Sequence, residues 1–242
     1  MIYCVFGTPS ILSQWLLHFM AQFAHVLHGA PHIIPCVHLE AMRQSWGQRA
    51  GRSAVIYSDI PEEKLSRVFL SAGAPMVVAH EDPMQALNFA MTSRKLELRQ
   101  GLRFLTQSYA TLEEIFLTPG ALIVGPRRMQ MRLRDFVAYV ADAVGGAVSD
   151  VEVGAVVARM VGPGMEDSLE TVGENVHRHL PPATLGSGLT RADEALAHAT
   201  LDQYAVMAAG HRMTRMDCPI DLLHDWERLG SYLSSDAPIE LT

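Results

Sequence analysis

The residues with the clearest potential for chemistry form one short stretch near the start of the chain: Gly7, Thr8, Pro9, Ser10, Ser13 and Gln14. Residues 1–6 are continuously apolar, which is typical of a strand buried on both faces. Apolar residues then recur at helical spacing from 11 to 27, with Ser10 as the expected N-cap. A loop that joins a strand to a helix can hold a phosphate, because the helix N-terminus offers free amide donors.

This loop lacks the residues of a working phosphate loop. Such a loop needs a second glycine, which lets the backbone curl, and a lysine that meets the phosphates. Gly7 is the only glycine before Gly29, and the two lysines of the chain, Lys64 and Lys95, lie far along the sequence. Ser10, Ser13 and Gln14 could still bind a small anion at the helix N-terminus. The alternative interpretation, which we favour, is an N-cap followed by polar residues in the first helical turn.

Strand-like and helical patterns alternate through the first 146 residues. Apolar runs at 32–39, 53–57, 75–79 and 121–124 predict further strands, and Pro35 favours either an edge position or a bulge for the first of them. Helical patterns cover 61–71, 84–116 with a break near Gly101, and 129–144. This order predicts an α/β fold with a mostly parallel sheet and helices on both faces.

The rest of the chain predicts a helical C-terminal part. Residues 150–160, 190–209 and 221–233 have helical patterns, and glycine and proline interrupt the stretch between the first two. We therefore expect one domain over 1–242, divided into an α/β core (1–146), an irregular lid or linker (147–189) and C-terminal helices (190–242).

The charge and cysteine content of the chain limit the partners and cellular locations that we expect for it. The formal net charge is -7, which argues against binding to nucleic acid or an anionic membrane, since both depend on neutralising phosphate with basic residues. Three widely separated cysteines, Cys4, Cys36 and Cys218, indicate reduced thiols and a cytoplasmic protein. The helix at 11–27 carries glutamines and histidines and no basic residues precede it, so we expect neither a signal peptide nor a membrane span.

Three stretches together resemble the sulfotransferases that use phosphoadenosine phosphosulfate (PAPS), a branch of the P-loop-like α/β proteins. Residues 7–16 lie over the family's first loop, approximately G-x-P-R-S-G-T-T-x-L. Residues 76–85 occupy the place of a strand that ends in R-D-P-R-D, and residues 121–145 are similar to a later strand and amphipathic helix. The resemblance spans about residues 1–146 and implies a sulfotransferase-like fold with a PAPS site.

The same alignment shows where this chain departs from the family. The basic residue of the loop falls on Ser10, its glycine on Leu12, and its two threonines on Ser13 and Gln14. The arginine that meets phosphate in the second motif falls on Glu81, which turns attraction into repulsion. The resemblance therefore implies a decayed cofactor site, and we expect no bound cofactor unless the protein is an enzyme, in which case it is PAPS.

An active enzyme would need substitutes for these residues. Arg49 and Arg52, with Arg43 as a third choice, could supply the lost positive charge, and His38 or Glu40 could act as general base. The alternative interpretation is a histidine at a strand end and an exposed glutamate, which is favoured where no donor site is present.

Two other groups of residues have competing interpretations. The stretch 80–82 could hold a cation, but consecutive side chains do not converge on one ion, and Asp82 before Pro83 is typical of a helix cap. The histidines match no metal-ligand spacing. Basic residues form two patches that are either solvated helix faces or a docking surface for an acidic partner: Arg94, Lys95, Arg99 and Arg103, and Arg127, Arg128, Arg132 and Arg134.

The leading functional hypothesis is a non-catalytic scaffold or interaction subunit, working in a larger bacterial assembly or as a homo-oligomer. Its partner would be a protein, not a nucleic acid or a membrane. The alternative is a divergent sulfotransferase, or a transferase that uses another small anionic donor. We expect an open crevice with inward-pointing arginines in the enzyme. In the scaffold we expect a crevice filled by Trp15, Trp46 or residues 165–188.

Overall fold

A computed structural model describes most of the first 162 residues and two later segments. The described residues are 1–36, 39–40, 42, 53–59, 63–116, 120–125, 127–162, 171–176 and 220–231. Cys218, the helix predicted at 190–209, and His38, Arg49 and Arg52 lie outside them.

A five-stranded parallel sheet organises the fold. Its strands are β1 (Ile2–Phe6), β2 (His32–Pro35), β3 (Ala54–Ser58), β4 (Met76–Ala79) and β5 (Ala121–Val124). Their order is β2-β3-β1-β4-β5, so β1 is central and β2, with Pro35, lies at an edge as predicted. All four strand pairs are parallel, which confirms the predicted α/β class with a parallel sheet.

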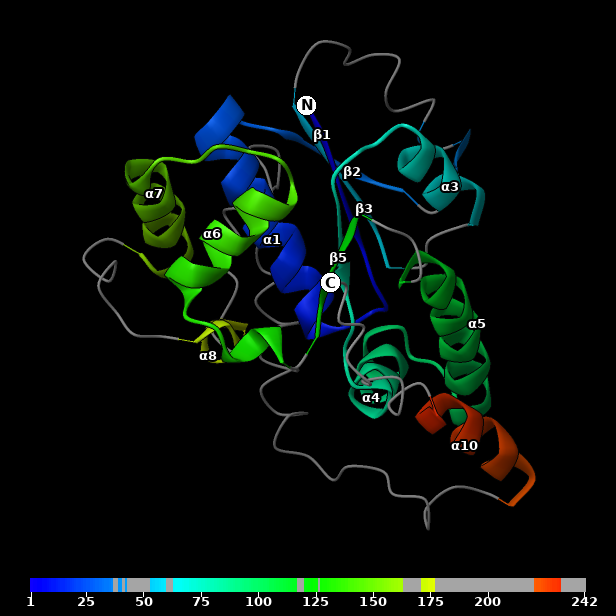
Figure 1. The fold of residues 1–242 in the computed structure, drawn as a ribbon. Coiled ribbons are helices and arrows are strands. Elements are labelled where there is room, and N and C mark those ends of the chain that lie inside the picture. The colour runs from blue at the N-terminus through cyan, green and yellow to red at the C-terminus, as the bar shows by residue number, and fades with distance from the viewer. Residues whose placement is uncertain are drawn as a thin grey trace.

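Helices cover both faces of this sheet (Figure 1). They are α1 (Ile11–His28), α3 (Glu63–Ser71), α4 (Pro83–Ser93), α5 (Leu98–Phe116), α6 (Leu133–Ala143), α7 (Asp150–Val161), α8 (Val172–Val176) and α10 (Leu223–Ser231), with short 3-10 turns η1 (Arg128–Gln130) and η4 (Ile220–Leu222). α7 confirms the helix predicted at 150–160, and η4 with α10 covers most of the one predicted at 221–233.

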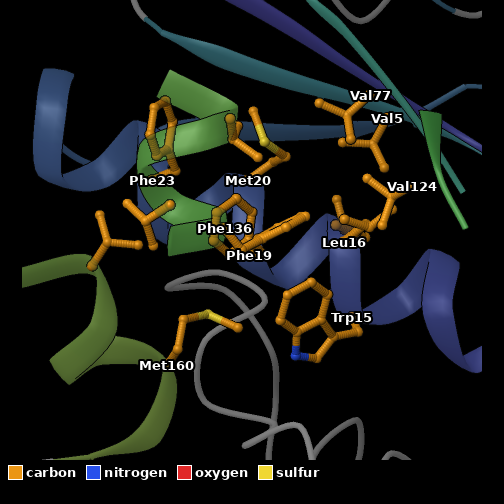
Figure 2. Close-up of a cluster of buried hydrophobic side chains, with 14 of the residues drawn as sticks. Val5, Trp15, Leu16, Phe19, Met20, Phe23, Val77, Val124, Phe136 and Met160 are labelled. Carbon is orange, nitrogen blue, oxygen red and sulfur yellow. The ribbon is translucent and has the colours of Figure 1, made fainter. Parts of the chain in front are cut away.

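The larger core lies between the sheet and α1, α6 and α7. Its centre is aromatic: Trp15 stacks on Phe19 at 5.4 Å between ring centroids, and Phe136 meets Phe19 edge-on at 5.0 Å (Figure 2). All three side chains are almost completely buried. Since aromatic pairs in these geometries add to the energy of burial, this cluster holds α1 and α6 firmly against β1.

The opposite face is covered by α3 and α5. Phe6 of β1, Phe69 of α3 and Leu112 of α5 belong to one buried cluster on this side. A third cluster joins α4 and α5 to α10 through Trp226 and Leu229. The two sets of helices thus pack on opposite faces of one sheet and bury alternate residues of the same strands.

The predicted break near Gly101 is wrong. The helical pattern is interrupted at residues 94–97, and Gly101 lies inside α5. A Cβ at Gly101 would be 2.9 Å from Leu87 Cδ1 and 3.0 Å from Met91 Cγ, so this glycine lets α5 approach α4 closely. The break falls at Lys95, whose φ of 53° is left-handed, a conformation that is uncommon for a lysine.

Candidate functional site

The loop after β1 carries the chain from the centre of the sheet into α1. Ser10 is the N-cap, with an extended backbone, and its Oγ accepts a hydrogen bond from the Ser13 amide at 3.1 Å, which confirms the predicted cap. Thr8, Ser10 and Ser13 are all buried. The loop therefore lies inside the molecule at the carboxyl end of the strands, where α/β proteins bind ligands.

The hydroxyls of this loop bond to the loop itself. Ser13 Oγ donates to the Thr8 carbonyl at 2.5 Å and accepts from Ser10 Oγ at 3.1 Å. Gly7 makes room for this arrangement, because a Cβ there would be 2.2 Å from Ser13 Oγ and 2.9 Å from the Cβ of Ala79. Two of the side chains that could contact an anion are thus already engaged.

Glu81 extends from the end of β4 to the first turn of α1. Its side chain is buried, and the Asp82 amide donates a hydrogen bond to its carboxyl at 3.3 Å. The Leu12 amide also lies close enough to this carboxyl to lower its pKa. Burial raises the pKa of Glu81, and the two amides oppose that rise only in part. The Leu12 amide is one of the free donors at the start of α1, so the protein's own carboxyl occupies a position that suits an external anion.

Tyr109 of α5 closes the site from the other face of the sheet. Its hydroxyl donates to the backbone carbonyl of Glu81 at 2.6 Å, and its ring meets His80 edge-on at 6.1 Å. Burial raises the pKa of Tyr109 well above its usual range, and the nearby Thr8 hydroxyl opposes this. Tyr109 is thus a neutral donor that fixes the backbone from which Glu81 projects.

Of the remaining predicted site residues, Gln14 and Glu40 lie within the described part of the chain, and His38, Arg49 and Arg52 lie outside it. The Gln14 amide donates to the Tyr57 hydroxyl at 2.7 Å, which directs it toward β3. Glu40 is exposed just beyond β2, the edge strand. The structure therefore brings Gly7, Thr8, Pro9, Ser10 and Ser13 together. The roles of His38, Glu40, Arg49 and Arg52 stay predictions.

Asp82 is a helix cap. Its Oδ1 accepts a hydrogen bond from the Gln85 amide at 2.9 Å, in the first turn of α4, as the sequence predicted. No group of metal-ligating side chains that could hold an ion occurs among the residues that the structure describes. Within that part of the chain, no helix is long and apolar enough to cross a membrane.

α8 packs beside the start of α1. Trp15 Nε1 donates to Asn175 Oδ1 at 2.6 Å, and the Val172 amide donates to the Met131 carbonyl at 2.7 Å. Part of the stretch predicted as an irregular lid or linker is therefore a short helix with buried contacts. Trp15 itself lies in the aromatic core (Figure 2), so it does not fill the loop region.

The role of Glu81 is the feature that sequence reasoning missed. From the sequence alone, Glu81 in place of the family's arginine predicts only repulsion of a phosphate group. Its contact with the Leu12 amide joins residues that are distant in sequence, and only the pairing of β1 with β4 makes them neighbours.

Comparisons with known proteins do not assign this chain to a family. No known protein family matches the sequence, and no curated protein is similar to it. Among solved structures, a mouse sulfotransferase crystallised with PAP is 11% identical, with a TM-score of 0.48 over 97% of this chain and 88% of that one. The chain is an α/β protein with a five-stranded parallel sheet covered on both faces.

Proposed function

We propose that this chain is a non-catalytic interaction subunit, built on a sulfotransferase-like scaffold whose cofactor site has decayed. The observation that carries the proposal is the buried Glu81 carboxyl, which accepts a hydrogen bond from the Asp82 amide and lies close to the Leu12 amide at the start of α1. An anionic donor would have to displace this carboxyl or lie beside it. Either costs free energy, because the site is buried and provides little solvent screening.

The loop hydroxyls support the same proposal. Ser10 and Ser13 stabilise the loop and the first turn of α1, and rearranging them toward a ligand would break three hydrogen bonds. Gly7, which in a phosphate loop would give the backbone access to the ligand, here accommodates Ser13. These residues therefore stabilise the fold of the proposed scaffold.

The alternative is a divergent sulfotransferase or another small-anion-donor transferase. The specific observation in its favour is that the loop and the α1 N-terminus lie at the carboxyl edge of a parallel sheet. In this alternative Arg49 and Arg52 neutralise the phosphates of PAPS. His38 or Glu40 would take the proton from the acceptor hydroxyl as its oxygen attacks the sulfur. The bond between the sulfur and the phosphate oxygen of PAPS would break in the same step, and the desulfated product would leave.

Calorimetric titration with PAPS and with its desulfated product tests the proposal. We expect no heat and no change in Tm for the wild type at about 1 mM ligand, a limit that corresponds to about -4 kcal/mol of binding free energy. Glu81→Gln removes the charge and keeps the shape of the side chain. Glu113→Gln, an exposed residue of α5, is the matched control.

Micromolar binding by the wild type, weakened by Arg49→Ala or Arg52→Ala, would contradict the proposal and support the enzyme. New binding in Glu81→Gln, with none in the wild type or in Glu113→Gln, would show that the internal carboxyl excludes the donor.

A further inference from the structure

Three exposed arginines lie within six residues on the segment that joins β5 to α6. Arg127 precedes η1, Arg128 begins it, and Arg132 is the N-cap of α6. These three residues are called the arginine surface below. They belong to the face of the sheet covered by α1, α6 and α7, since Leu133 and Phe136 of the same segment enter that core.

The backbone of this segment is held in place. The Arg128 amide donates to the Gly125 carbonyl at 2.9 Å, and the Met131 amide donates to the Arg128 carbonyl at 3.1 Å. The Val172 amide of α8 then binds the Met131 carbonyl. A partner that docks here therefore orders few additional backbone groups, which reduces the entropic cost of binding.

The side chains are available for a partner. The Arg128 guanidinium carbon lies 4.3 Å from the centre of the Tyr139 ring, and stacking of this kind leaves the N–H groups at the guanidinium edge free to donate. Elsewhere, exposed arginines pair with carboxylates within the chain: Arg94 with Asp59 and Arg99 with Asp221, each at 2.5 Å. No carboxylate among the described residues forms an ion pair with the arginine surface.

We infer that the arginine surface docks an acidic segment of a partner protein. This deepens the proposed function, on which it rests, by naming the chemistry of the partner. The chain as a whole carries a net charge of -7, so a local basic surface favours a short acidic segment over a long polyanion, which the rest of the protein would repel. Arginine also binds carboxylates through two parallel hydrogen bonds, which fixes the geometry of the contact.

Fluorescence anisotropy with a labelled peptide of alternating glutamate and serine tests this inference. The comparison peptide has glutamine in place of glutamate. We expect the acidic peptide alone to bind, with an affinity that falls as salt is added. Arg128→Glu/Arg132→Glu should weaken binding about tenfold or more, because each substitution replaces attraction with repulsion.

Arg103→Glu is the matched control, since Arg103 is exposed on α5, which covers the other face of the sheet. It should bind the acidic peptide as the wild type does. Arg128→Lys/Arg132→Lys keeps the positive charge but loses the paired N–H donors of arginine. Its affinity for the acidic peptide should lie between that of the wild type and that of Arg128→Glu/Arg132→Glu. Circular dichroism of each variant checks that the fold is retained.

Equal binding of the two peptides, or unchanged binding by Arg128→Glu/Arg132→Glu, would overturn the inference. Tighter binding of duplex DNA or phosphatidylserine vesicles than of the acidic peptide, lost in the same variant, would also overturn it. The PAPS titration uses a different ligand and different variants. A negative result for the arginine surface can therefore be told apart from a negative result for the proposed function.

Discussion

Gly7 shows how a single residue decides whether this loop can form. The space that a side chain would occupy is taken by Ser13 and by Ala79 of β4. Ser13 cannot leave without losing its hydrogen bonds to Thr8 and Ser10, and Ala79 is fixed in the sheet. The glycine is required here by close packing, whatever the loop binds.

Gly7→Ala should destabilise the protein by about 1–3 kcal/mol, because the added methyl group overlaps Ser13 and Ala79. Gly154→Ala in α7 is the control: nothing lies within 4 Å of the added Cβ, so the change should be neutral or stabilising by up to about 1 kcal/mol. Urea unfolding measures both. Equal stability of Gly7→Ala and the wild type would contradict the packing argument.

At this scale the helix caps were predictable from the sequence, and the position of the buried Glu81 carboxyl was not. Ser10 and Asp82 are recognisable because a cap depends on residues three positions apart. The contact between Glu81 and the Leu12 amide depends on strand pairing, which local patterns do not contain. The arginine in the family pattern marked this position as important, but only the fold shows what the acid does.

At the scale of elements, α1 connects most parts of the molecule. It follows the central strand, packs against α7, and reaches α8 through the hydrogen bond between Trp15 and Asn175. Both partners in this bond are buried. α8 is only five residues long, so this bond and the one between Val172 and Met131 hold it more than its own helical hydrogen bonds do.

Asn175→Leu should destabilise the protein by about 1–3 kcal/mol, because it leaves the indole N–H of Trp15 buried without an acceptor. In native-state hydrogen exchange of this variant, the backbone amides of α8 should exchange faster than those of α6. A double-mutant cycle with Trp15→Phe isolates the bond, since the second substitution removes the stranded donor. Strict additivity of the two changes would mean that the bond contributes nothing.

Most strands were predicted closely because each one is a short apolar run bounded by turn residues. The run predicted at 32–39 was too long: β2 ends at Pro35, and residues 39 and 40 are helical. β5 coincides with the predicted stretch 121–124, and β3 differs from its prediction by one residue at each end. The break between α4 and α5 was misplaced because Gly101 has a packing role that resembles a helix stop in sequence. Local patterns give the period of an element, whereas the approach of two helices is a tertiary property.

At the scale of the whole molecule, the larger core contains one buried histidine whose ring nitrogens make no hydrogen bond among the described residues. His18 of α1 is 1% exposed, and neither ring nitrogen has a hydrogen-bond partner in the described part of the chain. Burial, and to a lesser extent the charge of Arg159 on α7, lowers the pKa of His18 to about 4. Arg159 itself donates to Gln22 at 2.6 Å, so it stays close to this part of α1.

His18 should make the global stability fall in mild acid. Its pKa drops from 6.5 in the unfolded chain to about 4 in the folded one, so the unfolded state binds more protons between these values. Stability is therefore complete above pH 6.5 and decreases as pH falls toward 4. The pKa difference corresponds to a loss of roughly 3 kcal/mol.

His18→Leu should remove this loss and be at least as stable as the wild type near neutral pH, since it also relieves the cost of burying an unpaired imidazole. His224→Leu, on an exposed position of α10, should keep the wild-type pH dependence. Urea unfolding at several pH values between 4 and 7 measures the three curves. Parallel curves for His18→Leu and the wild type would mean that His18 exchanges protons freely in the folded state, and that α1 and α7 separate more readily than their packing indicates.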